Sequence, residues 1–241
     1  MNEKKYLEAK VNEIKYNDNR FKLKIGSDRY VFGIISGQDS KASFSKLLQY
    51  KTIYDTLKDI DYKLKISFEK AIEFAYSEAV QSDFSIFEKG SYEETVAYYY
   101  IENALFRISS LWDLLAQLYR LYYQIEVDAD KVYYNKIFNP RSPKSDVFKD
   151  NAREINDYIQ QEDDTDVEGE WEGNHGYVNA CRNKMTHRNS PNVSVMSDYD
   201  VNLKQHPSYI LKRIIEDYNV VSKYIGEILD IIKIEVMKDF D

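Results

Sequence analysis

Most of the chain repeats its hydrophobic residues with the period of an α-helix. From Lys41 onward, residues 43–58 and 62–82 carry apolar positions three and four apart, as on the buried face of an amphipathic helix. Ser91 followed by Glu94 is the pattern of a capping box, which predicts the start of a long helix over residues 91–123. Its apolar stripe consists of Ala97, Ile101, Leu105, Ile108, Trp112, Leu115, Leu118 and Tyr122.

The C-terminal half predicts three more helices separated by loops. Residues 126–144 contain two prolines and predict a loop with room for one helical turn, and a helix is expected over 145–161. After an acidic, glycine-bearing loop, a short helix over about 174–189 ends before Pro191, because proline disfavours helix in the residue before it. The last helix is expected from Pro207 to Phe240, with a core stripe of Leu211, Ile214, Ile215, Tyr218, Val221, Ile225, Ile228, Leu229, Ile232 and Val236.

The N-terminal residues follow a different pattern. Residues 12–35 alternate apolar and polar positions, and Asn17-Asp18-Asn19 and Gly26-Ser27-Asp28 are plausible turns. Two or three short antiparallel strands, a hairpin or meander, are the simplest interpretation; an extended arm is the alternative. We therefore expect a small β-rich segment over residues 1–40 and a mainly α, up-down helical bundle over 41–241.

Composition narrows the class of protein. With 241 residues, 43% hydrophobic and 31% charged, the chain is large enough for one sizeable globular domain with or without a small appendage. The 22 tyrosines suit half-buried helix faces. A net charge of −8 argues against non-specific coating of nucleic acid, although a local basic site could still act on RNA.

The cellular setting is expected to be the cytoplasm. The single cysteine excludes an internal disulfide and fits a reducing compartment. The first ten residues lack the apolar region of a secretory signal, and no stretch approaches 18 uncharged apolar residues, so no membrane span is predicted.

The segment CRNKMTHRNSP, residues 181–191, carries the strongest chemical signal. An arginine five residues before a histidine occurs by chance in about one chain of this composition in ten, so the spacing alone is weak. Three neighbouring features make the signal more specific: the small polar Asn183, the positive charges of Lys184 and Arg188, and the proline that follows. Arg182 and His187 are therefore the leading candidate site residues.

Helix geometry limits how this pair can meet. Residues five apart on an α-helix point about 140° away from each other. Either the last turn unwinds before Pro191 and brings the His187 imidazole round, or Arg182 and His187 from two copies converge across a twofold axis. Long amphipathic helices favour the second arrangement, a homodimer.

The residue types fit RNA cleavage by the substrate's own 2′-hydroxyl. Histidine changes protonation near neutral pH, so His187 can serve as acid or base. Arg182 stays charged and offers donors matched to phosphate oxygens, while Asn183 could hold the imidazole or a ribose hydroxyl. Lys184 and Arg188 are candidate RNA-binding residues. The chain has no HExxH and no CxxC, so neither a metal nor a cofactor is predicted.

A polar line crosses the predicted long helix beside its apolar stripe. It consists of Ser109, Asp113, Gln117 and Arg120. If the line faced the motif helix, Asp113 could orient Arg182 or His187. We interpret the line as facing water or a dimer seam, and keep Asp113 as a candidate site residue.

Structural alternatives exist for each candidate. Arg182 could be an ordinary surface arginine, and His187 a histidine favoured by the dipole at a helix C-terminus. Cys181 is expected to be a core residue beside Val178 and Met185 rather than a nucleophile, and His175 and His206 are expected in loops. The acidic loop lacks the spacing of a calcium-binding EF-hand and is interpreted as solvated.

Residues 182–187, RNKMTH, resemble the R-x(4–6)-H motif of the HEPN superfamily, including its frequent Asn after the Arg. The order of long helices, motif helix and closing long helix is similar over roughly residues 43–240, and the chain looks closest to the Cthe_2314-type group of small bacterial HEPN proteins. The resemblance assigns functional roles only to Arg182, His187 and, more weakly, Asn183.

The resemblance implies a metal-independent endoribonuclease that acts as a homodimer in toxin–antitoxin, abortive-infection or phage-defence settings. RNA is then the substrate, and a cognate antitoxin or a nucleotidyltransferase is a candidate partner. Some members of the superfamily are inactive and serve as RNA-binding or protein-interaction modules, which is the alternative function. A purely structural helical protein is the third.

Overall fold

The computed structural model describes residues 2–18, 20–21, 24–25, 29–30, 42–141, 149–163, 172–187, 190, 192–197 and 200–238. Most of them are helical, as the sequence predicts. The helices are α1 (Glu3–Glu13), α2 (Ala42–Ala75), α3 (Glu78–Asp83), α4 (Tyr92–Tyr122), the 3-10 turn η1 (Ala129–Lys131), α5 (Tyr134–Ile137), α6 (Lys149–Ile159), α7 (Asn174–His187) and α8 (Pro207–Lys238). The strands form two antiparallel pairs, β1 (Lys24–Ile25) with β2 (Arg29–Tyr30) and β3 (Val195–Ser197) with β4 (Asp200–Asn202).

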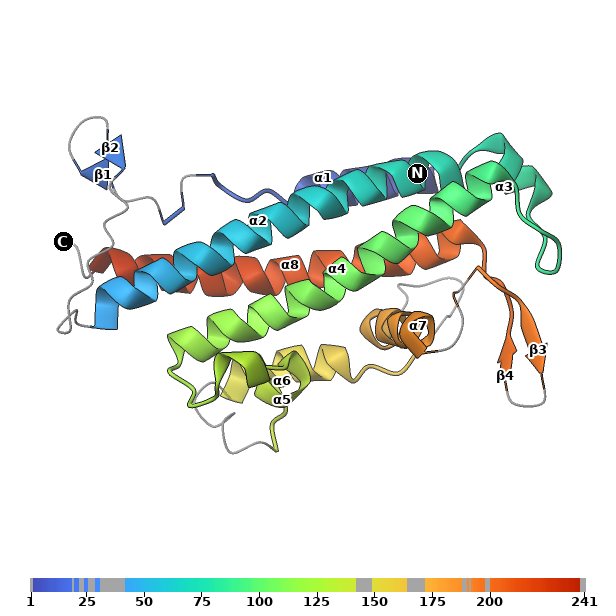
Figure 1. Ribbon diagram of the computed structural model, residues 1–241. Coiled ribbons are helices and arrows are strands. Elements are labelled where there is room, and N and C mark those ends of the chain that lie inside the picture. Colours follow the sequence, from blue (N-terminus) through green and yellow to red (C-terminus); the bar gives the residue numbers. More distant parts are fainter. Residues whose placement is uncertain are drawn as a thin grey trace.

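Three long helices, α2, α4 and α8, lie side by side and form the body of the molecule (Figure 1). The chain passes along α2 in one direction and returns along α4, and α8 runs in the direction of α4. α1 lies along α2 and α8, while α5, α6 and α7 lie on the other side of α4 (Figure 1). In the described part of the chain, no helix is both long and apolar enough to cross a membrane.

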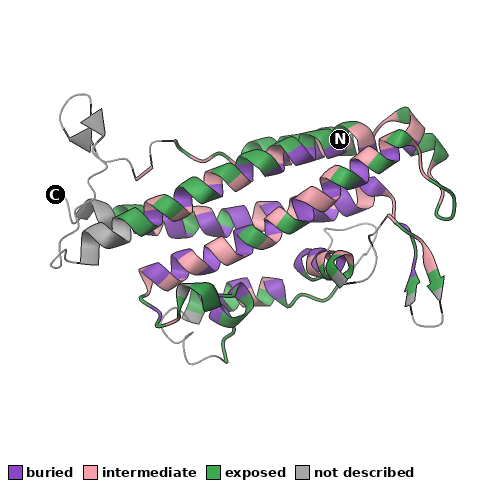
Figure 2. Ribbon diagram, viewed as in Figure 1, coloured by how far each residue is buried: buried purple, intermediate pink, exposed green. Residues whose placement is uncertain are grey.

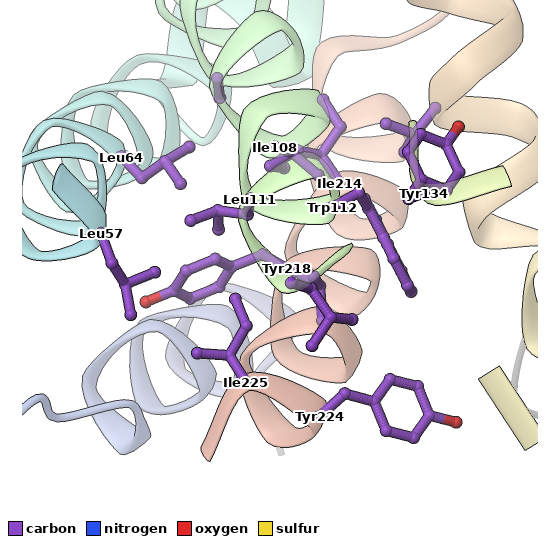
Figure 3. Close-up of a cluster of buried hydrophobic side chains, with 14 of the residues drawn as sticks. Leu57, Leu64, Ile108, Leu111, Trp112, Tyr134, Ile214, Tyr218, Tyr224 and Ile225 are labelled. Carbon is purple, nitrogen blue, oxygen red and sulfur yellow. The ribbon is translucent and has the colours of Figure 1, made fainter. Parts of the chain in front are cut away.

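The core is built from the predicted apolar stripes. The buried faces of the three long helices turn toward one another (Figure 2). Leu57 and Leu64 of α2 meet Leu111 of α4 and Tyr218 and Ile225 of α8 in the interior (Figure 3). Burying one such side chain fully contributes roughly 1.5–3 kcal/mol relative to leaving it exposed, so these stripes hold the bundle together.

The start of α4 is as predicted, with one difference in its cap. The Ser91 hydroxyl accepts a hydrogen bond from the Glu94 backbone N–H, 3.1 Å away. The Glu94 carboxylate does not complete a capping box; it forms an ion pair with Lys204, Oε1 to Nζ 2.8 Å, with both side chains buried. The cap residue was therefore correctly identified, and its acidic neighbour ties α4 to the segment before α8.

Two predicted helices, 43–58 and 62–82, are one continuous helix that ends earlier than expected. α2 passes through residues 59–61 without a break. Asp61 is buried there and accepts the Tyr218 hydroxyl (2.5 Å) and Lys65 Nζ (2.7 Å). The break comes at Ser77, whose hydroxyl accepts the Val80 backbone N–H and begins α3.

The N-terminal segment is only partly as predicted. The short β1–β2 pair, with Lys24 opposite Tyr30, confirms a hairpin within it. Residues 3–13, however, form the helix α1, which the sequence analysis missed. Its buried face is only Leu7 and Val11, too few positions to register as a periodic stripe, and both belong to the core of the bundle. Residues 31–41 lie outside the described part.

The β3–β4 pair was not predicted. Val195 lies opposite Asn202 and Met196 opposite Val201, and the pair stands away from the bundle (Figure 1). The Asn202 side chain fixes its base by donating to the Val193 carbonyl, 2.5 Å away. With three residues in each strand, the segment is too short to show a convincing alternation in sequence.

Candidate functional site

The motif helix α7 begins from a tightly held junction. Gly173 has a φ of +69°, and a Cβ there would lie 2.6 Å from the Asp163 Cα, so only glycine fits. The fully buried Arg213 of α8 bonds through Nη2 to Asp163 Oδ1 (2.8 Å) and to the Glu172 carbonyl (3.1 Å). Arg213 thus fastens both flanks of the acidic segment 164–171, which itself lies outside the described residues.

His175, in the first turn of α7, belongs to a buried polar network. Its Nε2 lies 3.0 Å from the Tyr134 hydroxyl and its Nδ1 lies 3.4 Å from Asp217 Oδ1. Asp217 also accepts the Trp112 indole N–H and the Tyr158 hydroxyl, both at 3.1 Å. These five residues, which we call the inner network, come from α4, α5, α6, α7 and α8, and so they fix where α7 starts.

The inner network corrects the sequence analysis, which expected His175 in a loop. The His175 side chain is only 4% exposed, and its ring lies edge-on to that of Trp112, 4.7 Å between centroids. One signal was present in the sequence: Asp217 is a carboxylate within the apolar stripe of α8, between Ile214 and Tyr218. A carboxylate at a core-facing position predicts buried hydrogen-bond partners, although it does not say which ones.

Burial controls the protonation of the tyrosines in this network. Burial, reinforced by the negative charge of Asp217, raises the pKa of Tyr134 to about 12. The same two causes raise the pKa of Tyr158 far above its ordinary value. Both phenols therefore stay protonated at neutral pH, and Tyr158 keeps its donor for Asp217.

Arg182 lies two helical turns beyond His175 on the same side of α7. Its Nη2 donates to Asn179 Oδ1 at 3.2 Å, while its Nε is buried and has no hydrogen-bond partner among the described residues. Burial raises the pKa of the Asp113 carboxyl, opposed by the Tyr134 backbone N–H, 3.5 Å away, and by the positive charge of Arg182. The structure therefore places Arg182 and Asp113 within electrostatic reach of each other.

This placement changes the interpretation of the polar line on α4. Ser109, Asp113, Gln117 and Arg120 are all half-buried. Asp113 accepts the Tyr134 backbone N–H of α5 and lies within electrostatic range of Arg182 on α7. The expectation that the line faces water or a dimer seam is therefore wrong at Asp113, because α5 and α7 cover that side of α4.

The remaining motif residues lie toward the exposed end of α7. Asn183 and Lys184 are exposed. His187 is the last residue of the helix, but its side chain and the whole of Arg188 lie outside the described part. The backbone is helical through residue 187, so unwinding, one of the two arrangements considered for this pair, does not occur by that point. Within one chain, positions 182 and 187 therefore remain about 140° apart around the helix axis.

Cys181 and His206 are where the sequence analysis expected them. Cys181 is buried in the core near Val178, and burial raises the pKa of its thiol, which makes it a poor nucleophile. His206 precedes α8 in a loop and accepts the Ser208 backbone N–H at 3.2 Å. Neither residue takes part in the arrangement around Arg182.

Two further features concern other kinds of site. Among the described residues, no group of three or more His, Cys, Asp or Glu side chains could hold a metal ion. An open hollow of about 660 Å³ lies at the C-terminal end of α4, with Arg120, Gln124, Glu126, Asp128 and Lys131 among its lining residues. It contains neither Arg182 nor Asp113, so it is separate from the motif.

No protein-family model, no curated protein and no solved structure matches this chain. The resemblance to the HEPN superfamily therefore rests on the motif and its helical setting alone.

Proposed function

We propose that the protein is a metal-independent endoribonuclease of HEPN type that acts as a homodimer, as a cytoplasmic toxin or phage-defence effector. The observation that carries this proposal is the state of Arg182. Its guanidinium donates to Asn179 and lies within electrostatic range of Asp113, yet its buried Nε has no partner among the described residues. A permanent cation that is positioned but incompletely bonded is suited to receive a phosphate.

The chemistry needs one proton acceptor, one proton donor and one cation. The ribose 2′-hydroxyl loses its proton to a histidine and attacks the adjacent phosphorus. The bond from phosphorus to the 5′-oxygen breaks, leaving a 2′,3′-cyclic phosphate, and the departing oxygen takes a proton from water. His187 of one chain accepts the 2′-hydroxyl proton, and Arg182 of the other chain stabilises the charge that develops on the phosphate oxygens. Asp113 positions Arg182.

Two chains are required in this proposal because of the geometry of α7. Positions 182 and 187 point in different directions on one helix, so an arginine and a histidine that share a phosphate come from different copies. Asn183 and Lys184 are exposed on the same helix, so they can contact the sugar and phosphate of a bound strand. Arg188, next to His187 in the sequence, contributes a further positive charge.

Mixing inactive variants tests this arrangement. We expect Arg182→Ala and His187→Ala each to abolish cleavage of a labelled single-stranded RNA while helicity and dimer mass remain unchanged. In a mixed dimer, the Arg182→Ala chain still supplies His187 and the His187→Ala chain still supplies Arg182. Mixing the two variants should therefore restore part of the lost activity.

The matched control is a mixture of Arg182→Ala with the double variant, which should remain inactive because it retains His187 on only one chain and Arg182 on neither. The proposal is wrong if His187→Ala cleaves RNA at the wild-type rate. It is also wrong if mixed dimers form, as seen by native mass spectrometry, and restore nothing.

A non-catalytic module that binds RNA or a protein partner is the second candidate. The net charge of −8 favours it, because an acidic chain gains little from general attraction to RNA. This alternative predicts binding without chain scission and little loss of binding in His187→Ala, both measurable by gel shift with the same RNA.

A further inference from the structure

The end of the β3–β4 pair has an inverted distribution of polar and apolar side chains. Val201 and Leu203 are 65% and 46% exposed, whereas Asn202 and Lys204, which alternate with them, are buried. A strand with one covered face normally buries its apolar residues and exposes its polar ones. Here the apolar side chains point away from the protein, which is typical of a surface that another molecule covers.

The two buried polar residues hold the strand in this orientation. Lys204 Nζ lies 2.8 Å from Glu94 Oε1, and both side chains are buried. The Asn202 amide donates to the Val193 carbonyl at 2.5 Å. Since successive side chains of a strand point to opposite faces, these two bonds keep the apolar neighbours on the outer face.

Neighbouring segments extend the apolar surface. Met196 lies opposite Val201 in the register and is 72% exposed. Ser194, two residues earlier and therefore on the same face, donates its hydroxyl to the Ile86 carbonyl at 2.5 Å. Ile86 and Phe87, in the loop before α4, are 40% and 72% exposed. We call the following five residues the ribbon face: Ile86, Phe87, Met196, Val201 and Leu203.

The ribbon face adjoins an open backbone edge. Opposite residues of an antiparallel pair alternate between those that exchange two backbone hydrogen bonds and those whose backbone groups point outward. Two residues separate Ser197 from Asp200, so this pair closes the hairpin as a hydrogen-bonded pair, and Met196 and Val201 form an outward-pointing pair. Leu203 continues the same edge, because its backbone forms no hydrogen bond among the described residues.

We infer that an extended segment of a partner protein adds to β4 as a third, antiparallel strand and lays its apolar side chains on the ribbon face. A strand in this position supplies the backbone groups that the edge lacks and covers the exposed side chains. A two-stranded hairpin is marginally stable by itself, so a third strand also stabilises it. The partner residues opposite Val201 and Leu203 are apolar, and those between them are polar.

Charge favours a protein over RNA or a lipid surface as the occupant. Lys204 is the only lysine or arginine in residues 190–206, and it is buried against Glu94. The turn between the strands instead carries Asp198 and Asp200 in its sequence. RNA and anionic lipids bind to exposed cations, whereas a partner segment with a basic residue beside the turn is complementary to these carboxylates.

This surface contains none of the motif residues, so the inference does not depend on the nuclease proposed above. It also differs from the proposed homodimer, because the occupant is a separate protein. An apolar helix is a less suitable occupant, since its backbone groups are bonded within the helix and would leave the edge of β4 unpaired.

A synthetic peptide tests the mode of binding. The probe has valine at every second position, threonine between, and a lysine at each end, and NMR chemical shifts of the isotope-labelled protein report binding. In the proposed strand, the valine amides face β4 and the threonine amides face away. Methylation of the valine nitrogens should abolish binding, whereas methylation of the threonine nitrogens should not. Equal binding of both methylated peptides, or no binding of the parent peptide, overturns the inference.

Hydrogen exchange locates the added strand. The amide N–H groups of Val201 and Leu203 should exchange rapidly in the free protein, because they point outward, and at least about tenfold more slowly with the peptide bound. Amides of α2 should exchange at the same rate in both states. Protection that appears elsewhere but not at Val201 and Leu203 contradicts the inference.

A double variant tests the face. Val201→Thr combined with Leu203→Thr retains β propensity but removes apolar contact, and should weaken peptide binding by about tenfold or more. Ile66→Thr, at an exposed apolar position on α2 (41%), is the matched control and should bind the peptide as wild type does. Circular dichroism confirms that both variants fold. Unchanged binding by the double variant means that the peptide lies elsewhere, and the inference is wrong.

The same double variant distinguishes the other occupants. Its mass by light scattering should equal that of the wild type, and a fall in mass would show that the ribbon face joins copies of this chain. It should also bind single-stranded RNA and anionic vesicles no differently from the wild type. A loss of either interaction in the double variant, but not in Ile66→Thr, would assign the ribbon face to that ligand and overturn the inference.

Discussion

The two ends of α7 differ in how their polar groups are bonded. At the inner end, His175 is buried between Tyr134 and Asp217, and Asp217 receives two further donors from Trp112 and Tyr158. At the outer end, only two turns away, Arg182 has one hydrogen bond to Asn179 and a buried Nε with no partner among the described residues.

This difference separates residues that build the fold from residues that remain available for a ligand. Buried polar groups in folded proteins are nearly always bonded, because an unmet donor costs about 1–3 kcal/mol. Among the described residues, each end of α7 has a buried nitrogen without a hydrogen bond, His175 Nδ1 and Arg182 Nε. His175 Nδ1 still faces the Asp217 carboxylate of its own chain at 3.4 Å, whereas Arg182 forms no ion pair within the described part, and such a departure is expected where a substrate or second chain supplies the missing acceptor.

High pH provides the largest test of the inner end. A tyrosine whose pKa is raised by folding stabilises the protein fully below its unfolded pKa of 10.0, and this stability is lost as the pH rises toward the folded value, about 12 for Tyr134. We expect helicity to be lost above about pH 10, together with the appearance of tyrosinate absorbance from Tyr134 and Tyr158. Complete ionisation of every tyrosine with intact helicity would contradict their burial.

Removing the central carboxylate should have the next largest effect. Asp217→Ala leaves His175, the Trp112 indole N–H and the Tyr158 hydroxyl without their acceptor. We expect a loss of about 3–5 kcal/mol in the free energy of unfolding, measured by urea denaturation. The exposed Asp59→Ala on α2 is the control and should change it by less than about 0.5 kcal/mol. Equal effects would mean that Asp217 does not hold the network.

Removing one hydrogen-bond donor to Asp217 should lower the free energy of unfolding by less. Tyr158→Phe keeps the ring, which stacks against Trp112 with 5.9 Å between centroids, and deletes only the hydrogen bond to Asp217. A hydrogen bond to a charged group contributes about 1.5–3 kcal/mol, so the denaturation midpoint should fall by less than in Asp217→Ala. Tyr62→Phe, at an exposed position on α2, should leave the midpoint unchanged.

The smallest effect on stability is expected at the outer end. Arg182 is half-buried, and its interaction with Asp113 should contribute about 1 kcal/mol or less. Arg182→Ala should therefore unfold at nearly the wild-type urea concentration, even though it loses RNA cleavage. A loss as large as that of Asp217→Ala would show that Arg182 is a structural residue, and the contrast between the two ends would disappear.

Sequence reasoning succeeded where a pattern repeats along one helix. The stripes from Ala97 to Leu118 and from Leu211 to Ile232 extend over many turns, so they identified α4 and α8 and most of the core. α1 was missed because its buried face is only Leu7 and Val11. In that helix, packing against α2 and α8 decides the structure, and no local pattern reports such packing.

The candidate site shows the same limit. The spacing of Arg182 and His187 is local, and the sequence could single it out. The contact of Asp113 with α5 and α7 depends on how helices pack, and the sequence suggested it only as one of two possibilities. The pairing of His175 with Asp217 joins residues 42 positions apart, so neither periodicity nor spacing could predict it.

The clamp formed by Arg213 has a practical consequence for experiments on this protein. Arg213 holds Asp163 on one side of residues 164–171 and the Glu172 carbonyl on the other. We therefore expect an affinity tag or a fluorescent label inserted between these two anchor points to leave both bonds to Arg213 in place.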